Sequence, residues 1–168
     1  MQMTQEGNES VTRRRVGIAE HVVATDPAIL TTSGLGSCVG ICLYDDQGRG
    51  GLAHCMLPSA DDTEADVATK PAKHVDTGIE ILQTELLDAG ALRGKLRAKV
   101  AGGSDMLGFS EGPTVGERNV AVARAELKER DIPIVATETG GGQGRSLEFE
   151  TGAARLHVTA ADGSSTVL

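Results

Sequence analysis

The sequence has few aromatic residues, few cysteines and no long apolar run. Tryptophan is absent, and aromatic side chains make up only 2% of the 168 residues. Proteins that bind single-stranded nucleic acid stack the bases on aromatic side chains, so this scarcity argues against such a ligand. The charge agrees, because 24 acidic and 16 basic residues give a formal net charge of -8, which repels phosphate backbones. We therefore expect no nucleic-acid partner.

No segment is apolar over the roughly 20 residues that a membrane-spanning helix needs, so the sequence predicts no direct membrane insertion. The opening stretch, MQMTQEGNESVTRRR, also lacks the apolar core of a secretory signal, which indicates a cytoplasmic location. Because that compartment is reducing, the 3 cysteines are expected to be free thiols. The acidic balance fits both a salt-rich cytoplasm and an ordinary acidic protein.

A chain of 168 residues can bury one core without disulfides or metals, so a single domain over residues 13–160 is expected. The two ends are polar and rich in small residues. Residues 1–12 are predicted to be a disordered tail and residues 161–168 a flexible one, because neither has enough apolar surface to offset the entropy lost on ordering.

The apolar pattern predicts a mixture of strands and helices. Short β-branched runs around a turn-forming DDQGRG indicate a β-hairpin over residues 39–57. Apolar residues three or four apart predict an amphipathic helix over 71–90 and a second over 115–131. Further strands are expected at 96–102, 132–138, 145–150 and 154–158. The predicted fold class is α/β, a single layered domain in which a mixed β-sheet or sandwich is covered by two main helices.

Cys38 follows the glycine-rich stretch Gly34-Leu35-Gly36-Ser37 and directly precedes an apolar strand. Glycines permit a turn that exposes the thiol and directs successive backbone N–H groups toward one point, as a nucleophile with an oxyanion hole requires. The alternative is a small buried cysteine beside a tight turn, which is the commoner case for a free cysteine. This motif alone does not decide between them.

His54 lies on the second strand of the predicted hairpin. A turn centred near Asp46 would set it nearly opposite Cys38, close enough for the imidazole to contact the thiol, whereas a turn centred on Gln47 and Gly48 would shift the register. A histidine that is satisfied by backbone groups on a half-buried strand is the alternative.

The other cysteines and histidines have no motif-like spacing. Cys42 should share the face of Cys38 and Cys55 should point away from His54, so both are interpreted as core thiols, and no metal site is predicted. His21, His74 and His157 are likewise assigned structural roles.

Two glycine-rich loops follow predicted strands, at residues 101–106 and 139–145. Neither contains the Lys-Ser/Thr of a phosphate-binding P-loop, and neither leads from a strand into a helix as a dinucleotide fingerprint does. They are interpreted as tight turns, with the alternative that they border the active site and let a substrate backbone approach closely.

Six blocks together resemble the CheD family of chemoreceptor glutamine deamidases. The blocks are GLGSCVGICLYD, GLAHCMLP, KHVDTGIEIL, KVAGGSDM, VGERNVAVA and TETGGGQGRSLEF. The resemblance as a whole runs from about Val16 to His157. The resemblance implies a layered α/β fold similar to deamidating bacterial toxins and a cofactor-free Cys-His-Thr set, here Cys38, His54 and Thr32. Thr31 is the neighbour of Thr32, so a shift of one residue in the motif would change the assignment of the threonine.

The resemblance further implies deamidation of glutamine side chains on methyl-accepting chemoreceptors through a cysteine thioester. The oxyanion would be held by backbone groups of the loop that includes Gly36, Ser37 and Val39. Contacts to substrate or partner would come from Gly102, Gly103, Leu107 and Arg145, with Leu107 standing where family members often carry an aromatic residue.

A regulatory role is the alternative function. Many members of this family bind the CheC phosphatase and stimulate its action on a response regulator, so the chain would then act as a binding module. A papain-like peptidase is disfavoured, because the chain is short and only sixteen residues separate Cys38 from His54.

Overall fold

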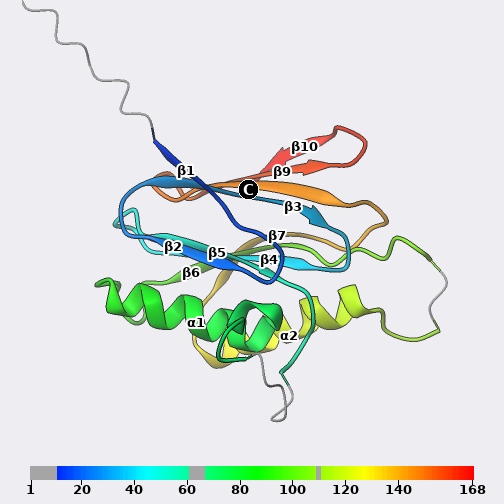
Figure 1. Ribbon diagram of the computed structural model, residues 1–168, viewed down its shortest axis with the longest axis horizontal. Coiled ribbons are helices and arrows are strands. Elements are labelled where there is room, and N and C mark those ends of the chain that lie inside the picture. The colour runs from blue at the N-terminus through cyan, green and yellow to red at the C-terminus, as the bar shows by residue number, and fades with distance from the viewer. Residues whose placement is uncertain (1–10, 61–66, 109–110) are drawn as a thin grey trace, which may run out of the picture.

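Two stacked β-sheets and one layer of helices make up the computed structural model, which describes residues 11–60, 67–108 and 111–168 (Figure 1). One sheet has the order β1 (Thr12–Arg15), β3 (Ala28–Leu35), β8 (Arg145–Glu150), β9 (Arg155–Ala160) and β10 (Ser165–Val167). The other has the order β2 (His21–Ala24), β5 (Gly50–Cys55), β4 (Val39–Tyr44), β6 (Arg97–Gly102) and β7 (Ile134–Thr139). The helices are η1 (Pro71–Lys73), α1 (Val75–Asp88) and α2 (Val115–Glu129).

Both sheets are mixed. The β1–β3 and β6–β7 pairs are parallel, and the remaining pairs are antiparallel. Figure 1 shows α1 and α2 on the outer face of the sheet that contains β4, with the other sheet on its opposite face. The predicted fold class, a layered α/β domain with two main helices, is therefore confirmed.

The central strand β4 is buried on both faces, which explains its continuous apolar sequence VGICLY. Side chains alternate along it between two cores. Val39, Ile41 and Leu43 pack under the helices, whereas Cys42 and Tyr44 belong to the core between the two sheets. This second core includes Cys38 at its margin.

The predicted hairpin is confirmed, but its register differs from the expected one. Tyr44 pairs with Gly50 and Gly40 pairs with His54, so the turn is centred on Gln47 rather than on Asp46. The shift moves the partner of His54 from position 38 to position 40. Because side chains alternate with a period of two, this even shift leaves Cys38 and His54 on the same face of the sheet.

Both predicted helices form, within a few residues of the expected bounds. Their apolar faces pack on the sheet through Ile79 and Leu82 of α1 and Leu127 of α2. The cap of α2 is Thr114, whose hydroxyl accepts a hydrogen bond of 3.1 Å from the Glu117 N–H. None of the helices in the described ranges combines the length and apolar character needed to cross a bilayer.

The chain ends differ from the expected tails. Of the expected tail 1–12, residues 1–10 lie outside the described residues, and Thr12 begins β1. Residues 165–167, expected to be flexible, form the edge strand β10 beside β9. Leu168 then exchanges two backbone hydrogen bonds with Leu156. Backbone pairing orders this polar segment, and a composition argument based on apolar side chains does not detect it.

Gly116, in the first turn of α2, fixes how closely this helix approaches the sheet. A Cβ there would lie 2.6 Å from the carbonyl carbon and oxygen of Gly103 and 2.7 Å from the Ser104 carbonyl oxygen. These are backbone atoms, so the clash has no flexible side chain to absorb it.

We expect Gly116→Ala to lower the free energy of unfolding by about 1–3 kcal/mol, measured by urea denaturation. Gly144→Ala is the control, because the nearest atom to a Cβ there is the Leu35 carbonyl oxygen at 3.8 Å. Equal stability of the two variants would contradict the close packing of α2.

Candidate active site

Cys38 lies where the chain crosses from one sheet to the other, between the end of β3 and the start of β4. Gly34 allows this turn, because its φ of 72° is in the left-handed region that favours glycine. The thiol is half-buried at the margin of the core between the sheets. The sequence prediction of a partly exposed cysteine on a glycine turn agrees with this position.

The carbonyl oxygens of three successive residues in this turn are held by hydrogen bonds. That of Gly36 accepts from the Ser104 N–H at 2.9 Å and from the Ser104 hydroxyl at 2.7 Å. That of Ser37 accepts from the Asn119 side-chain amide at 2.8 Å, and that of Cys38 accepts from the Gly103 N–H at 2.8 Å. The turn is therefore fixed from the side of β6 and α2.

Gly102 and Gly103 support the cysteine turn directly. Both have positive φ, at 108° and 68°, and a Cβ on Gly102 would lie 2.4 Å from the Cys38 carbonyl oxygen. The sequence favoured tight turns here and left open that these glycines let a substrate backbone approach closely. The backbone that approaches them in the structure is that of Cys38 itself.

His54 is fully buried on β5, between the two sheets. Its Nδ1 lies 2.8 Å from the Thr32 hydroxyl oxygen on β3, and the Thr32 hydroxyl donates to the Val16 carbonyl at 2.7 Å. Because a hydroxyl has one proton, Thr32 must accept from an Nδ1–H of His54. That tautomer leaves a lone pair on Nε2, and it is Thr32 rather than Thr31 that makes the contact.

The Nε2 atom of His54 is buried and has no hydrogen-bond partner among the described residues. Cys38 lies on the same face, two residues before the Gly40 that pairs with His54. Diagonal neighbours within a strand pair have Cα atoms roughly 7–8 Å apart. Cys38 itself immediately precedes β4, and no hydrogen bond joins its thiol to the imidazole among the described residues.

Burial shifts both groups toward their neutral forms. Loss of water raises the pKa of the Cys38 thiol, an effect partly opposed by its own backbone N–H. Burial also lowers the pKa of His54. At neutral pH the pair is therefore a thiol and an uncharged imidazole, and the imidazole can accept a proton.

The remaining cysteines and histidines have other environments. Cys42 and Cys55 are fully buried in different cores, and burial raises the pKa of each thiol. His21 contacts Glu85 at 3.0 Å and His157 contacts Glu150 at 2.7 Å, while His74 precedes α1. Within the described ranges, no three His, Cys, Asp or Glu side chains are grouped to hold a metal ion.

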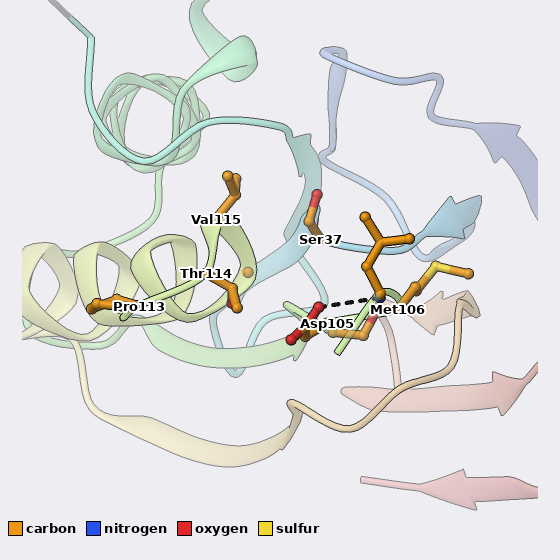
Figure 2. Close-up of a pocket in the computed structure, with 9 residues that line it drawn as sticks. Ser37, Asp105, Met106, Pro113, Thr114 and Val115 are labelled. Carbon is orange, nitrogen blue, oxygen red and sulfur yellow. Dashed lines mark hydrogen bonds between the residues drawn. The ribbon is translucent and has the colours of Figure 1, made fainter. Parts of the chain in front are cut away.

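A cavity of about 610 Å³ opens beside the cysteine turn, between that turn and the start of α2 (Figure 2). Its lining is mainly apolar. Met106 and Leu107 are 62% and 78% exposed, and Val115 is 41% exposed. Ser37 also lines this cavity, so it adjoins the residue that precedes Cys38. The predicted contact residue Leu107 is thus accessible beside the turn.

Arg145, which was expected to contact a substrate or partner, is buried. Its guanidinium pairs with the Glu138 carboxylate and donates to the Gly140 carbonyl at 2.7 Å. Its charge is therefore neutralised within the protein, and its side chain is not exposed at the loop surface. An arginine in a sequence does not reveal that an acidic partner, here on β7 of the other sheet, will neutralise it.

Asn119 is a site residue that the sequence analysis missed. It is fully buried on α2, and its side-chain amide donates to the carbonyls of Ser37 and Met56. The available signal was its position four residues before Ala123, on the apolar face of the predicted helix. A polar residue on such a face needs a buried partner.

Comparisons with known proteins agree on one family. Residues 56–160 match the family model described as CheD chemotactic sensory transduction. A probable chemoreceptor glutamine deamidase CheD of Haloarcula marismortui is 47% identical over 93% of this chain and 90% of the relative. A probable chemoreceptor glutamine deamidase CheD 2 of Geobacter metallireducens is 48% identical over 86% of this chain and 91% of the relative.

The chemoreceptor glutamine deamidase CheD of Bacillus velezensis is 40% identical over 91% of this chain and 95% of its own length. Among solved structures, a Neisseria meningitidis protein overlaps 79% of this chain and 64% of its own, with 13% identity and a TM-score of 0.40. That likeness is too low to carry an argument. The family model and the relatives together show that the chain belongs to the CheD family.

Proposed function

We propose that this protein hydrolyses glutamine side-chain amides of methyl-accepting chemoreceptors, with Cys38 as nucleophile and His54 as general base. One observation carries the proposal: the unpartnered Nε2 of a buried, oriented histidine on the face shared with a half-buried thiol. A lone pair held in this way is what a general base requires. The names of the relatives, which are chemoreceptor glutamine deamidases, supply the substrate class.

The reaction begins when His54 Nε2 takes the thiol proton and Cys38 Sγ attacks the carboxamide carbon. The carbonyl π pair moves to oxygen and forms an oxyanion. When that pair returns, the C–N bond breaks, and the proton on Nε2 passes to the leaving nitrogen and releases ammonia. Water, deprotonated by the same imidazole, then attacks the thioester. The C–S bond breaks, the proton on Nε2 returns to Sγ, and the products are glutamate and the free thiol.

The N–H groups of Ser37 and Cys38 are the proposed oxyanion donors. The peptide planes that carry these N–H groups also carry the carbonyls of Gly36 and Ser37, which already accept hydrogen bonds from Ser104 and Asn119. These hydrogen bonds hold the planes in place before substrate binds. Val39 is less suited, because it is fully buried and paired with both Cys55 and Gly102 inside the sheet. Gly36 contributes the turn that positions these donors.

The apolar cavity beside Ser37 is the proposed receptor-docking surface. The expected substrate is a helix of a chemoreceptor. A helix that presents a glutamine beside apolar side chains would place those apolar side chains against Met106, Leu107 and Val115. Docking there would bring the carboxamide to Cys38 without exposing His54.

Cys38→Ala should abolish ammonia release while the protein stays folded, because the half-buried site tolerates a smaller side chain. The assay is mass spectrometry of receptor fragments, which gain about one dalton for each glutamine converted to glutamate. Cys42→Ala is the control for cysteine loss, since Cys42 is fully buried in the core between the sheets. Full activity of Cys38→Ala would end the proposal.

The pH dependence should follow His54. Its pKa lies below the ordinary value near 6.5, so the base stays unprotonated, and activity persists, on the acid side of 6.5. Activity then falls as the pH drops through the lowered pKa. Initial rates measured from pH 4.5 to 8 test this, and an acid limb centred at or above pH 6.5 would contradict it.

Thr32 should act through the tautomer of His54. In Thr32→Val the Nδ1–H loses its acceptor, so kcat should fall by about 10-fold or more, as part of the roughly 10²–10⁴-fold contribution of general acid–base catalysis. Thr32→Ser keeps the hydroxyl and should retain most of the activity. Equal kcat values for the Val and Ser variants would show that the hydroxyl has no part in the reaction.

A further inference from the structure

We propose that Asn119 is a positioning residue that sets the distance between Cys38 and His54. This inference rests on the proposed function, because it concerns the same thiol and imidazole. Asn119 lies on α2 and contacts neither of them through any hydrogen bond that the structure describes. Its effect would pass through the backbone segments that carry the two residues.

The side-chain amide of Asn119 joins those two segments. One N–H donates to the Ser37 carbonyl at 2.8 Å and the other to the Met56 carbonyl at 3.1 Å. Ser37 immediately precedes Cys38, and Met56 follows His54 by two residues. Both protons of one amide therefore hold the start of β4 and the end of β5 to a single point on α2.

The orientation of the amide follows from its partners. Two carbonyl oxygens can accept hydrogen bonds but cannot donate them, so the NH₂ group must face them. The Oδ1 atom is then buried with no hydrogen-bond partner among the described residues. Leaving a buried acceptor unpaired is unfavourable, and native proteins do so rarely. A residue kept for stability alone would avoid that cost.

The helix that carries Asn119 is itself held rigidly. Gly116, one turn earlier, packs against the backbone of Gly103 and Ser104 with no room for a methyl group. Gly103 in turn donates to the Cys38 carbonyl. Figure 2 shows this first turn of α2 beside Ser37, on the rim of the apolar cavity. The side-chain amide of Asn119 is therefore held in a fixed position, from which it binds both strand ends.

The competing explanation is that Asn119 only stabilises the fold. The substitutions are therefore Asn119→Ala, which removes the amide, and Asn119→Asp, which keeps its shape but cannot donate both hydrogen bonds. Thr151→Val is the matched control. Thr151 is also buried and makes two hydrogen bonds to the backbone of Ala28. Ala28 is the first residue of β3, whereas Cys38 follows the last.

Two measurements separate positioning from stability, each corrected for the folded fraction. The first is kcat and KM for deamidation of a receptor fragment. The second is the rate of Cys38 alkylation by iodoacetamide as a function of pH, which needs no receptor. Cys42 and Cys55 are fully buried, so alkylation of the folded protein reports Cys38, and mass spectrometry verifies the site.

In the wild-type protein we expect the alkylation rate to rise with pH in two steps, one at the lowered pKa of His54 and one at the raised pKa of Cys38. Asn119→Ala and Asn119→Asp should lose the acid-side step, as His54→Ala should. Their kcat should fall about 10- to 100-fold, with KM changed by less than about threefold, because misplacement of reacting groups costs rate rather than binding. Thr151→Val should keep both steps and its kcat.

A double-mutant cycle completes the test. If Asn119 acts through the thiol–imidazole contact, Asn119→Ala should change alkylation no further in a His54→Ala background. Additive losses, or a folded Asn119→Asp variant with wild-type kcat and both pH steps, would overturn the inference. A wild-type protein that releases no ammonia from receptor fragments, yet shows the alkylation effects, would defeat the proposed function and leave the positioning role standing.

Discussion

The site depends on the hydrogen bonds that fix three successive carbonyls, those of Gly36, Ser37 and Cys38. These residues carry the chain from one sheet to the other. The hydrogen bonds from Ser104, Asn119 and Gly103 fix the place of that crossing. Because the crossing is fixed, β3 lies over β5, and Thr32 of one sheet meets His54 of the other at 2.8 Å. The site is therefore a product of the contact between the two sheets rather than of any one loop.

Burial between those sheets decides the electrostatic character of the pair. An exposed cysteine and histidine could rest as a thiolate and an imidazolium, but here removal of water favours the uncharged form of each group. Thr32 reinforces this by accepting from Nδ1 while it donates to Val16, an arrangement that a neutral hydroxyl can make and a carboxylate could not. On the proposed mechanism, charge develops only when the thiol attacks, and the backbone N–H groups are already in place to meet it.

The sequence predicted those features that depend on local pattern. The hairpin, both main helices and the closing strands follow from periodicity and turn residues. The predicted register of the hairpin was wrong by two residues, and because this shift is even, Cys38 and His54 still share a face. Thr32 came only from the family resemblance, since nothing in the spacing of a threonine predicts a contact across two sheets. Asn119 depends on the carbonyls of Ser37 and Met56, which lie 82 and 63 residues away along the chain. Arg145 and Glu138 are only seven residues apart, but they meet across the two sheets, and β10 pairs with β9 through its backbone. Apolar periodicity and turn residues reveal none of these contacts.

The burial of His54 also constrains how the proposed reaction must proceed. His54 has no exposed surface, whereas Cys38 is half-buried and follows Ser37, which lines the cavity. On the proposed mechanism a carboxamide reaches Nε2 past the thiol. Ammonia must leave by that route, and the hydrolytic water must arrive by it, because both exchange a proton with the same atom. The water can then be activated only after ammonia has departed, so the imidazole serves the two half-reactions in strict order without any second base.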